Sequence, residues 1–208
     1  MKRTPAKSSS SSSDTADAPQ KLDTLSQRAR AHLEAWFIDH EVLRVFYRNF
    51  YRLTPKSAPK PVFRSNHPSP KFIRKLQQRH GLKTILSLRA ANQTGQYRLE
   101  KETCQRLGIT LINEPISSRS FPKVDKLNKI IAHLQNSEYP LLIHCKSGAD
   151  RAGLVSVLFA HFVLGQPIAQ ARRQLSMKFG HFRWADTGKL DYLFDACERF
   201  EKTQPDIS

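Results

Sequence analysis

The stretch LLIHCKSGADRAGL, residues 141–154, gives the strongest indication of the fold. Its first four residues, Leu141–His144, predict a buried strand because they form a short and mostly apolar run. The strongly apolar residues 154–164 predict a helix, and only a short loop separates this helix from the strand. A strand that passes through a short loop into a helix is the repeating unit of α/β folds, so the stretch predicts a strand within a parallel sheet.

The chain before and after this stretch alternates between strand-like and helix-like segments. The expected strands cover residues 62–64, 84–88, 109–112 and 141–144. The expected helices cover residues 70–80, 99–107, 124–134, 154–164 and 189–202, with a further helical stretch after Pro167. Ser69-Pro70 and Gly81 supply the start and stop signals of the first helix. The pattern predicts an α/β fold with a mostly parallel central sheet of about four to five strands flanked by helices.

The N-terminal residues differ in character from the rest of the chain. Residues 1–20 are rich in serine and predict a disordered tail, because such a composition buries too little apolar surface to repay ordering. Residues 21–55 predict a basic, aromatic-rich amphipathic helix. Three arginines spaced four residues apart should share one face of it: Arg44, Arg48 and Arg52. Such a helix either packs on the α/β domain, residues 56–204, or lies on an acidic membrane surface through residues 36–52.

The charge balance favours anionic partners. The chain has 34 Lys and Arg against 18 Asp and Glu, a formal net charge of +16. Phosphate groups, nucleic acid and acidic membrane surfaces all attract such a protein, and charge alone does not choose among them. The loop after residues 141–144 favours a specific phosphate site, and we do not expect nucleic acid as a partner.

The cysteine content and the hydropathy indicate the compartment. Three cysteines are too few and too scattered for a disulfide framework, which predicts a reduced, cytoplasmic location: Cys104, Cys145 and Cys197. No apolar run approaches the ~18 residues of a membrane-spanning helix, and the N-terminus lacks the apolar core of a secretory signal. Peripheral contact with the inner face of the membrane, through residues 36–52, is the alternative location.

The loop after Leu141–His144 carries the residues of a phosphate site. Backbone N–H groups of such a loop converge on one point, and the N-terminus of the following helix adds partial positive charge. Gly148 allows the backbone to bend towards a ligand, and Arg151 offers a planar fork for two phosphate oxygens. The same positive environment favours the thiolate form of Cys145, which is the form that attacks phosphorus.

These residues resemble a known signature. His144-Cys145-x5-Arg151-x-Gly153 resembles the signature of the cysteine-dependent protein tyrosine phosphatase superfamily, in its small dual-specificity branch. FRSNHPSP at residues 63–70 and LKTILSLR at residues 82–89 are similar to the opening of bacterial members of that branch. The resemblance covers about residues 60–200 and makes residues 56–204 a dual-specificity-phosphatase-like catalytic domain.

The resemblance also implies roles for single residues. Cys145 would be the nucleophile, Arg151 the clamp on the phosphate, and the amides of residues 146–151 the cradle. His144 would tune the thiolate through the local hydrogen bonds. The further residues expected to contact the substrate are Lys146, Ser147, Gly148, Ala149 and Arg119. The chemistry implied by the superfamily uses no metal and no cofactor.

Two departures from the superfamily pattern affect the mechanism. The residue after the signature arginine is usually Ser or Thr, and here it is Ala152, so release of the phosphate should be slower unless Ser147 substitutes. The upstream loop, residues 114–122, contains no Asp to act as the general acid. Asp150 is one candidate, because an in-loop Asp resembles the myotubularin-type and Sac-type phosphoinositide phosphatases. Glu114 is the alternative, and each carboxylate could instead be structural.

The substrate is left open by the sequence. The leading interpretation is a protein-tyrosine or dual-specificity phosphatase working through phosphocysteine. A phosphoinositide or other phospholipid phosphatase is the alternative, because Lys146 matches a loop lysine of the phosphatase-and-tensin type. A third interpretation is a phosphate-binding module with little turnover. Three late polar residues have a spacing that does not place them: His181, Arg183 and Asp186.

Overall fold

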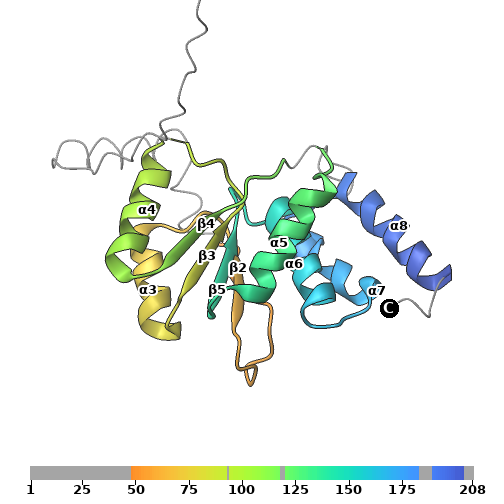
Figure 1. The fold of residues 1–208 in the computed structure, drawn as a ribbon, viewed down its shortest axis with the longest axis horizontal. Coiled ribbons are helices and arrows are strands. Elements are labelled where there is room, and N and C mark those ends of the chain that lie inside the picture. Colours follow the sequence, from red (N-terminus) through yellow and green to blue (C-terminus); the bar gives the residue numbers. More distant parts are fainter. Residues whose placement is uncertain (1–47, 93, 118–119, 183–188, 204–208) are drawn as a thin grey trace, which may run out of the picture.

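The computed structural model describes residues 48–92, 94–117, 120–182 and 189–203. They form a five-stranded sheet covered by helices on both faces, as Figure 1 shows. The strands are β1 (Tyr51–Arg52), β2 (Val62–Ser65), β3 (Thr84–Ser87), β4 (Thr110–Asn113) and β5 (Leu141–His144). The helices are α3 (Pro70–His80), α4 (Gly95–Leu107), α5 (Val124–Asn136), α6 (Asp150–Phe162), α7 (Ile168–Ala171) and α8 (Lys189–Thr203), with 3-10 turns η1 (Arg172–Gln174) and η2 (Met177–Phe179). The predicted α/β fold with a mostly parallel sheet is confirmed.

The order of the strands brings the loop after β5 to the middle of the sheet. The order is β1-β2-β5-β3-β4, and every neighbouring pair is parallel except β1 with β2. At the carboxyl end of β5, His144 is in register with Ser65 on one side and Ser87 on the other. Ligands of open parallel sheets bind at this edge, so the register places the candidate loop where such sites form.

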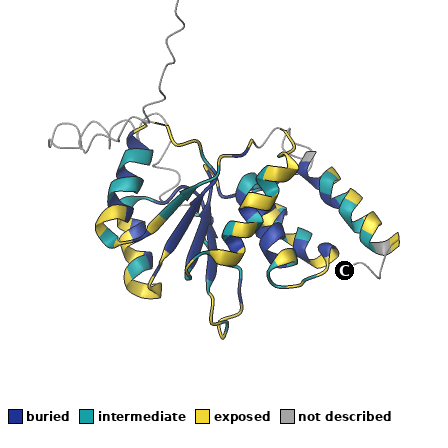
Figure 2. Cartoon of the chain, in the orientation of Figure 1, coloured by how far each residue is buried: buried dark blue, intermediate teal, exposed yellow. Residues whose placement is uncertain are grey.

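The two faces of β5 are buried in different cores. Leu141 and Ile143 belong to the larger apolar cluster, which includes residues of α5, α6, α7 and α8, whereas Leu142 belongs to a smaller cluster with α3 and α4. All four residues of β5 have no exposed surface, and Figure 2 shows the central strands as the most buried part of the fold. Because both faces are packed, β5 is a rigid base for the loop that follows it.

Helix boundaries agree with the sequence where capping signals are strong. Helix α3 begins after Ser69, whose side chain accepts a hydrogen bond from Phe72 N, and ends at Gly81 in the left-handed conformation, as predicted. Helix α6 begins at Asp150, earlier than the predicted residue 154. The first turn of α6 is polar or small because part of it faces the loop, so hydrophobic periodicity did not include it.

The predicted N-terminal helix is wrong at its carboxyl end. Tyr51–Arg52 form strand β1, antiparallel to β2, and Leu53 N donates a hydrogen bond to Val62 O at 2.8 Å. The edge of β2 offers hydrogen-bond partners to the backbone of residues 51–53, which a helix at these residues would not use. The expected domain boundary at residue 56 therefore falls after the first strand. The tail (1–20) and most of the helix (21–47) lie outside the described residues.

Arg48 and Arg52, two of the three arginines that were expected on one helical face, do not lie on a helix, and Arg44 lies outside the described residues. The Arg48 guanidinium lies 4.5 Å from the centre of the Phe72 ring, and that of Arg52 lies 5.9 Å from the Phe63 ring. Both pack on aromatic side chains of the domain. The described part of residues 36–52 is therefore docked on the domain rather than presented as a continuous basic face.

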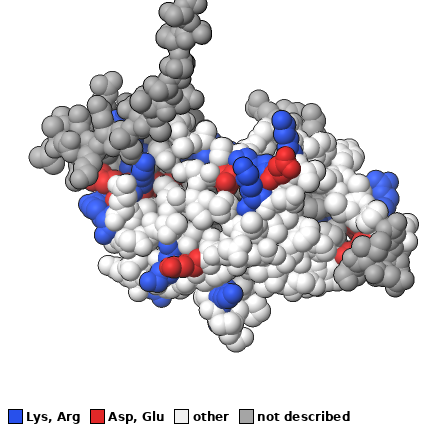
Figure 3. Space-filling model, in the orientation of Figure 1, with Lys and Arg blue, Asp and Glu red and all other residues white. Residues whose placement is uncertain are grey.

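The surface charge is dispersed on the face seen in Figure 3. Lys and Arg side chains of the described residues lie in several separate groups there, with Asp and Glu among them. None of the described helices is long and apolar enough to cross a membrane.

Candidate active site

The loop after β5 curls around the sulfur of Cys145. The backbone N–H of Gly148 points to Cys145 Sγ at 3.2 Å, and Ala149 N donates to Ser147 Oγ at 3.3 Å. Cys145 is 1% exposed, at the bottom of the loop, whereas Lys146 and Ser147 are exposed at its rim. Helix α6 starts immediately after the loop, so its partial positive charge faces the same point. The arrangement can hold an anion above the sulfur.

Gly148 is required by the path of the loop. Its φ is +77°, a conformation that side chains with a Cβ rarely adopt. A Cβ at this position would lie 2.6 Å from Asn66 N and 2.7 Å from Ser65 C, both backbone atoms. The loop therefore closes against the end of β2 only because residue 148 has no side chain.

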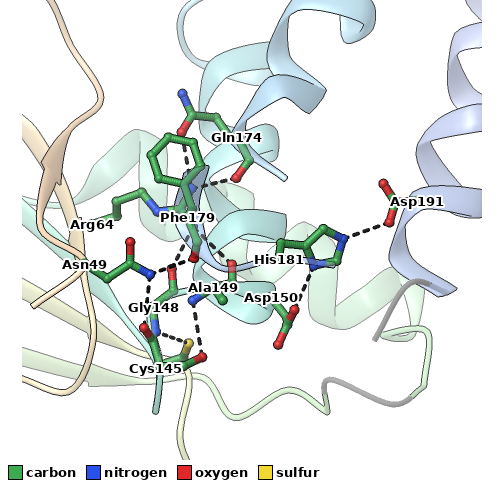
Figure 4. A network of polar contacts seen from close by, with 11 residues as sticks. Asn49, Arg64, Cys145, Gly148, Ala149, Asp150, Gln174, Phe179, His181 and Asp191 are labelled. Carbon is green, nitrogen blue, oxygen red and sulfur yellow. Dashed lines mark hydrogen bonds and ion pairs between the residues drawn. The ribbon is translucent and has the colours of Figure 1, made fainter. Parts of the chain in front are cut away.

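Arg64 anchors the outer side of the loop (Figure 4). Its side chain is fully buried, and Nη2 donates to Gly148 O at 2.7 Å and to Ala149 O at 3.0 Å, while Nη1 donates to Gln174 O at 2.7 Å. Its guanidinium also stacks 4.2 Å from the centre of the Phe179 ring. With these carbonyls bonded outward, the N–H groups of the loop are available on the inner side. The sequence offered one signal for this role, a lone charge in the buried strand VFRS.

Asn49 ties the loop to the segment that contains η1 and η2. Its Nδ2 donates to Ser147 O at 3.1 Å and to Phe179 O at 2.8 Å. Asn49 is 4% exposed and has a positive φ of 46°, which asparagine tolerates better than most residues. Sequence reasoning missed it because it lies in the segment expected to be helical.

The remaining predicted residues occupy different places. Arg151 is half-buried in the first turn of α6, and its Nη1 donates to Leu88 O at 3.1 Å, just beyond the carboxyl end of β3. Asp150 is half-buried beside it. Ala152 is fully buried, so no hydroxyl follows the arginine. Arg119 lies outside the described residues.

Three buried polar side chains lie behind the loop. His144 Nε2 is 2.8 Å from Glu100 Oε1, and His67 Nδ1 is 4.0 Å from Glu100 Oε2. The backbone completes the connection, because His144 Nδ1 lies 3.4 Å from Cys145 O and His67 N donates to Lys146 O at 3.3 Å. Burial alone would raise the pKa of Glu100, but the two histidines outweigh it and the pKa is lowered. Glu100 is therefore a buried carboxylate that, through the two histidines, supports the first residues of the loop, Cys145 and Lys146.

The same three side chains could in principle ligate a metal. Their ligand atoms lie within 4.8 Å of one another, and two His with one carboxylate is a donor set that zinc uses. Tetrahedral ligands at about 2.0–2.1 Å from zinc stay roughly 3.3 Å apart. The 2.8 Å separation of His144 Nε2 and Glu100 Oε1 is shorter and fits an ion pair, so we interpret the cluster as electrostatic support for the loop.

Glu100→Gln should lower the free energy of unfolding at neutral pH by about 1–3 kcal/mol, because the buried histidines lose the charge that they face. A carboxylate whose pKa is lowered by folding stabilises above its unfolded pKa, near 4.5, and loses that contribution as the pH falls through the folded pKa. The difference from the wild type should therefore shrink below pH 4.5 in urea titrations. Glu102→Gln, at a surface pair with Arg106, is the control. A constant difference at all pH values would contradict the ionised state of Glu100.

Glu114, the alternative general acid, is held by a lysine and a histidine. Lys126 Nζ donates to Glu114 Oε2 at 2.5 Å, and His133 Nε2 lies 3.1 Å from Oε1. Burial raises the pKa of Glu114, but these two partners on α5 outweigh it and the pKa is lowered. The carboxylate is therefore the favoured form at neutral pH, and it has no proton to donate.

Asp150, the other candidate, belongs to a chain of three side chains. His181 Nδ1 lies 2.7 Å from Asp150 Oδ1, and His181 Nε2 lies 2.8 Å from Asp191 Oδ2 on α8. Burial lowers the pKa of His181, but the two carboxylates outweigh it and the pKa is raised. Sequence reasoning named His181 without placing it and missed Asp191, while Arg183 and Asp186 lie outside the described residues.

A central parallel strand, a curled Cys-x5-Arg loop with the sulfur at its base, and a helix that starts from the loop together define the class of cysteine-dependent, dual-specificity-like phosphatases. The comparison with families agrees and is more specific. The family described as "DSP-PTPase phosphatase fused to NAD+ Kinase" (PTP-NADK) matches residues 60–186, more than half of the chain. The chain belongs to this family.

Solved structures share the fold at low sequence identity. TpbA from P. aeruginosa is 19% identical with a TM-score of 0.54, and the match covers 73% of this chain and 89% of TpbA. Tk-PTP in its G95A mutant form is 17% identical with a TM-score of 0.53, covering 72% and 96%. The core catalytic domain of the PP-IP phosphatase SIW14 from S. cerevisiae is 22% identical with a TM-score of 0.51, covering 77% and 94%. No curated protein matches the chain.

Proposed function

We propose that the chain is a phosphoric monoester hydrolase that works through a phosphocysteine at Cys145. The observation that carries the proposal is the loop itself, in which Gly148 N points at Cys145 Sγ from 3.2 Å. Amides turned inward stabilise both a thiolate and the equatorial oxygens of a transferring phosphoryl group. Family membership supports the same reaction class.

The reaction takes two steps. In the first, the Cys145 thiolate attacks phosphorus while Arg151 and the loop amides bind the equatorial oxygens, and Asp150 gives a proton to the leaving oxygen. In the second, water attacks the phosphocysteine, Asp150 takes its proton, and the thiolate departs. Asp150 is favoured over Glu114 in this role because the charge of its partner His181 is also balanced by Asp191, whereas Lys126 and His133 bind both oxygens of Glu114.

The proposed substrate is a phosphoprotein, with phosphotyrosine or both phosphotyrosine and phosphoserine as the target. A phosphoinositide or another phospholipid is the second candidate. It is supported by Lys146, which is exposed at the rim of the loop where a second anionic group of a headgroup would lie. A polyanionic headgroup would use that charge, whereas a phosphotyrosine would not need it.

A phosphate-binding module with little turnover is the competing interpretation of the same loop. Ala152 supplies no hydroxyl to assist departure of the thiolate, so breakdown of the phosphocysteine is expected to be the slower step. If the chain is an enzyme, the phosphocysteine therefore accumulates during turnover. A module that only binds phosphate would form no covalent adduct.

A denaturing quench during turnover of p-nitrophenyl phosphate tests the proposal. We expect a burst of p-nitrophenol close to one equivalent, and intact-mass and peptide analysis should place a phosphoryl group on Cys145. Initial rates on a phosphotyrosyl peptide, a phosphoseryl peptide and phosphoinositide vesicles then rank the substrates. Phosphate binding without a burst, turnover or covalent adduct on any of these would establish the binding module instead.

A further inference from the structure

We infer that His181 is a positioning residue for the proton transfer, with its imidazole holding the carboxyl group of Asp150 and Asp191 holding the imidazole in turn. This inference rests on the proposed function and adds two residues to it. Neither the family match nor the structural likenesses assign a role to His181 or Asp191.

The three side chains come from separate elements and meet end to end. Asp150 is the first residue of α6, His181 follows η2, and Asp191 is in the first turn of α8 (Figure 4). Both ring nitrogens of His181 have a carboxylate partner, at 2.7 and 2.8 Å. His181 is 2% exposed and Asp191 is 7% exposed, so water does not compete freely for these contacts.

The segment that carries His181 is fixed to the loop independently. Arg64 binds Gln174 O as well as Gly148 O, and Asn49 binds Phe179 O as well as Ser147 O. Residues 174–179 therefore share two buried anchors with the phosphate loop. Because His181 follows this segment closely, its ring is held in place relative to Asp150.

The charges around His181 favour its imidazolium form. Both flanking carboxylates accept hydrogen bonds from the doubly protonated ring, and together they outweigh the effect of burial. Arg172, Arg173 and Lys178 line the same pocket as His181 and Asp191. Arg172 is engaged by Asp195 at 2.5 Å and Glu198 at 2.8 Å. The two side chains that hydrogen-bond to the His181 ring, Asp150 and Asp191, are both carboxylates.

The proton balance gives each residue one task. In the first step the S–P bond forms, the P–O bond breaks, and the proton on Asp150 Oδ2 goes to the leaving oxygen. Asp150 is left as a carboxylate, which the imidazolium at Oδ1 stabilises. In the second step a proton of the attacking water returns to Asp150 as the S–P bond breaks. His181 keeps its charge throughout, and Asp191 balances that charge so that Asp150 can still be protonated.

The test compares a substrate that needs the proton with one that does not. An alkyl leaving group needs protonation, whereas p-nitrophenolate leaves without it, and general acid catalysis is worth about 10²–10⁴-fold. Asp150→Asn removes the general acid and therefore gives the full loss of kcat/KM for O-phosphoserine. His181→Gln should give part of that loss, roughly 10-fold or more for O-phosphoserine, and less than ~3-fold for p-nitrophenyl phosphate.

A second readout separates positioning from a structural role. In His181→Gln the carboxylate of Asp150 loses its imidazolium, so the alkaline limb of the pH profile for O-phosphoserine should move to higher pH. In Asp191→Asn the pKa of the His181 ring, followed by NMR, should fall. Asp195→Asn removes the same charge from the same helix at the Arg172 pair, and should change neither quantity.

The outcomes are distinct. Equal losses on both substrates with an unmoved pH profile in His181→Gln and Asp191→Asn would overturn the inference and make the chain of three structural. If His181→Gln does not fold, the substrate ratio and ring titration of Asp191→Asn decide. If the wild type shows no Cys145-dependent hydrolysis of p-nitrophenyl phosphate, the proposed function fails rather than this inference.

Discussion

Cys145→Ser is expected to lose turnover of p-nitrophenyl phosphate by on the order of 10⁴–10⁶-fold, the range seen when a covalent nucleophile is removed. A serine hydroxyl stays protonated at neutral pH, because among the described residues the contact to the sulfur comes from the Gly148 amide and not from a base in the role that His has in serine hydrolases. The loop should keep its shape, since Arg64 and Asn49 hold it through backbone carbonyls and not through the sulfur. Inorganic phosphate should therefore still bind, as measured by titration calorimetry.

The other two cysteines provide the controls. Cys197 is half-buried on α8, and Cys197→Ser should leave turnover within about two-fold, as expected of a substitution away from the site. Cys104 is buried on α4, where burial and Glu100 raise the pKa of its thiol, so it is not a second nucleophile. Residual turnover of a few per cent in Cys145→Ser would show that another group attacks phosphorus, and the phosphocysteine mechanism would be wrong.

The parts of the site that sequence reasoning predicted are those that lie next to one another along the chain. The bounds of β5 follow from an apolar run that is buried on both faces, and the loop and the start of α6 are continuous with it. The role of Gly148 follows in the same way, because a glycine in a tight loop between a strand and a helix is a local signal.

The parts that were missed depend on contacts between distant segments. Arg64 and Gly148 are separated by 84 positions, and Asn49 and Ser147 by 98. Nothing in the spacing of residues indicates such pairs, since they arise only when β2 and β5 become neighbours. The helical pattern that was extended through Tyr51 failed for the same reason, because pairing with β2 replaced local periodicity. Glu100 and Asp191 were not singled out in the sequence, because a charged residue on a helix gives no local sign that the fold will bury it.

Arg64→Met should lower the free energy of unfolding by roughly 3–5 kcal/mol, because three backbone carbonyls lose hydrogen bonds from a charged donor, and the desolvation cost of the buried guanidinium, which is removed with it, offsets part of their sum. Methionine keeps much of the volume and the contact with Phe179, so the effect reports the lost bonds more than a cavity. The carbonyls of Gly148 and Ala149 would turn to find other donors, which turns the loop amides away from the sulfur. A displacement of this kind near the reacting atoms can cost about 10²-fold in kcat/KM.

Urea unfolding and kcat/KM for p-nitrophenyl phosphate measure the two effects in the same protein. Arg52→Met is the matched control, because Arg52 lies on the neighbouring strand and donates to Thr54 Oγ1 and Lys56 O near the surface. Its loss should cost no more than about 1 kcal/mol, and turnover should be kept. Arg64→Lys separates charge from geometry, since an ammonium group cannot reach carbonyls of both the loop and Gln174 as a planar fork does. If Arg64→Lys retains wild-type turnover and Arg64→Met is destabilised no more than Arg52→Met, the loop is shaped by its own backbone, and Arg64 only fills the space behind it.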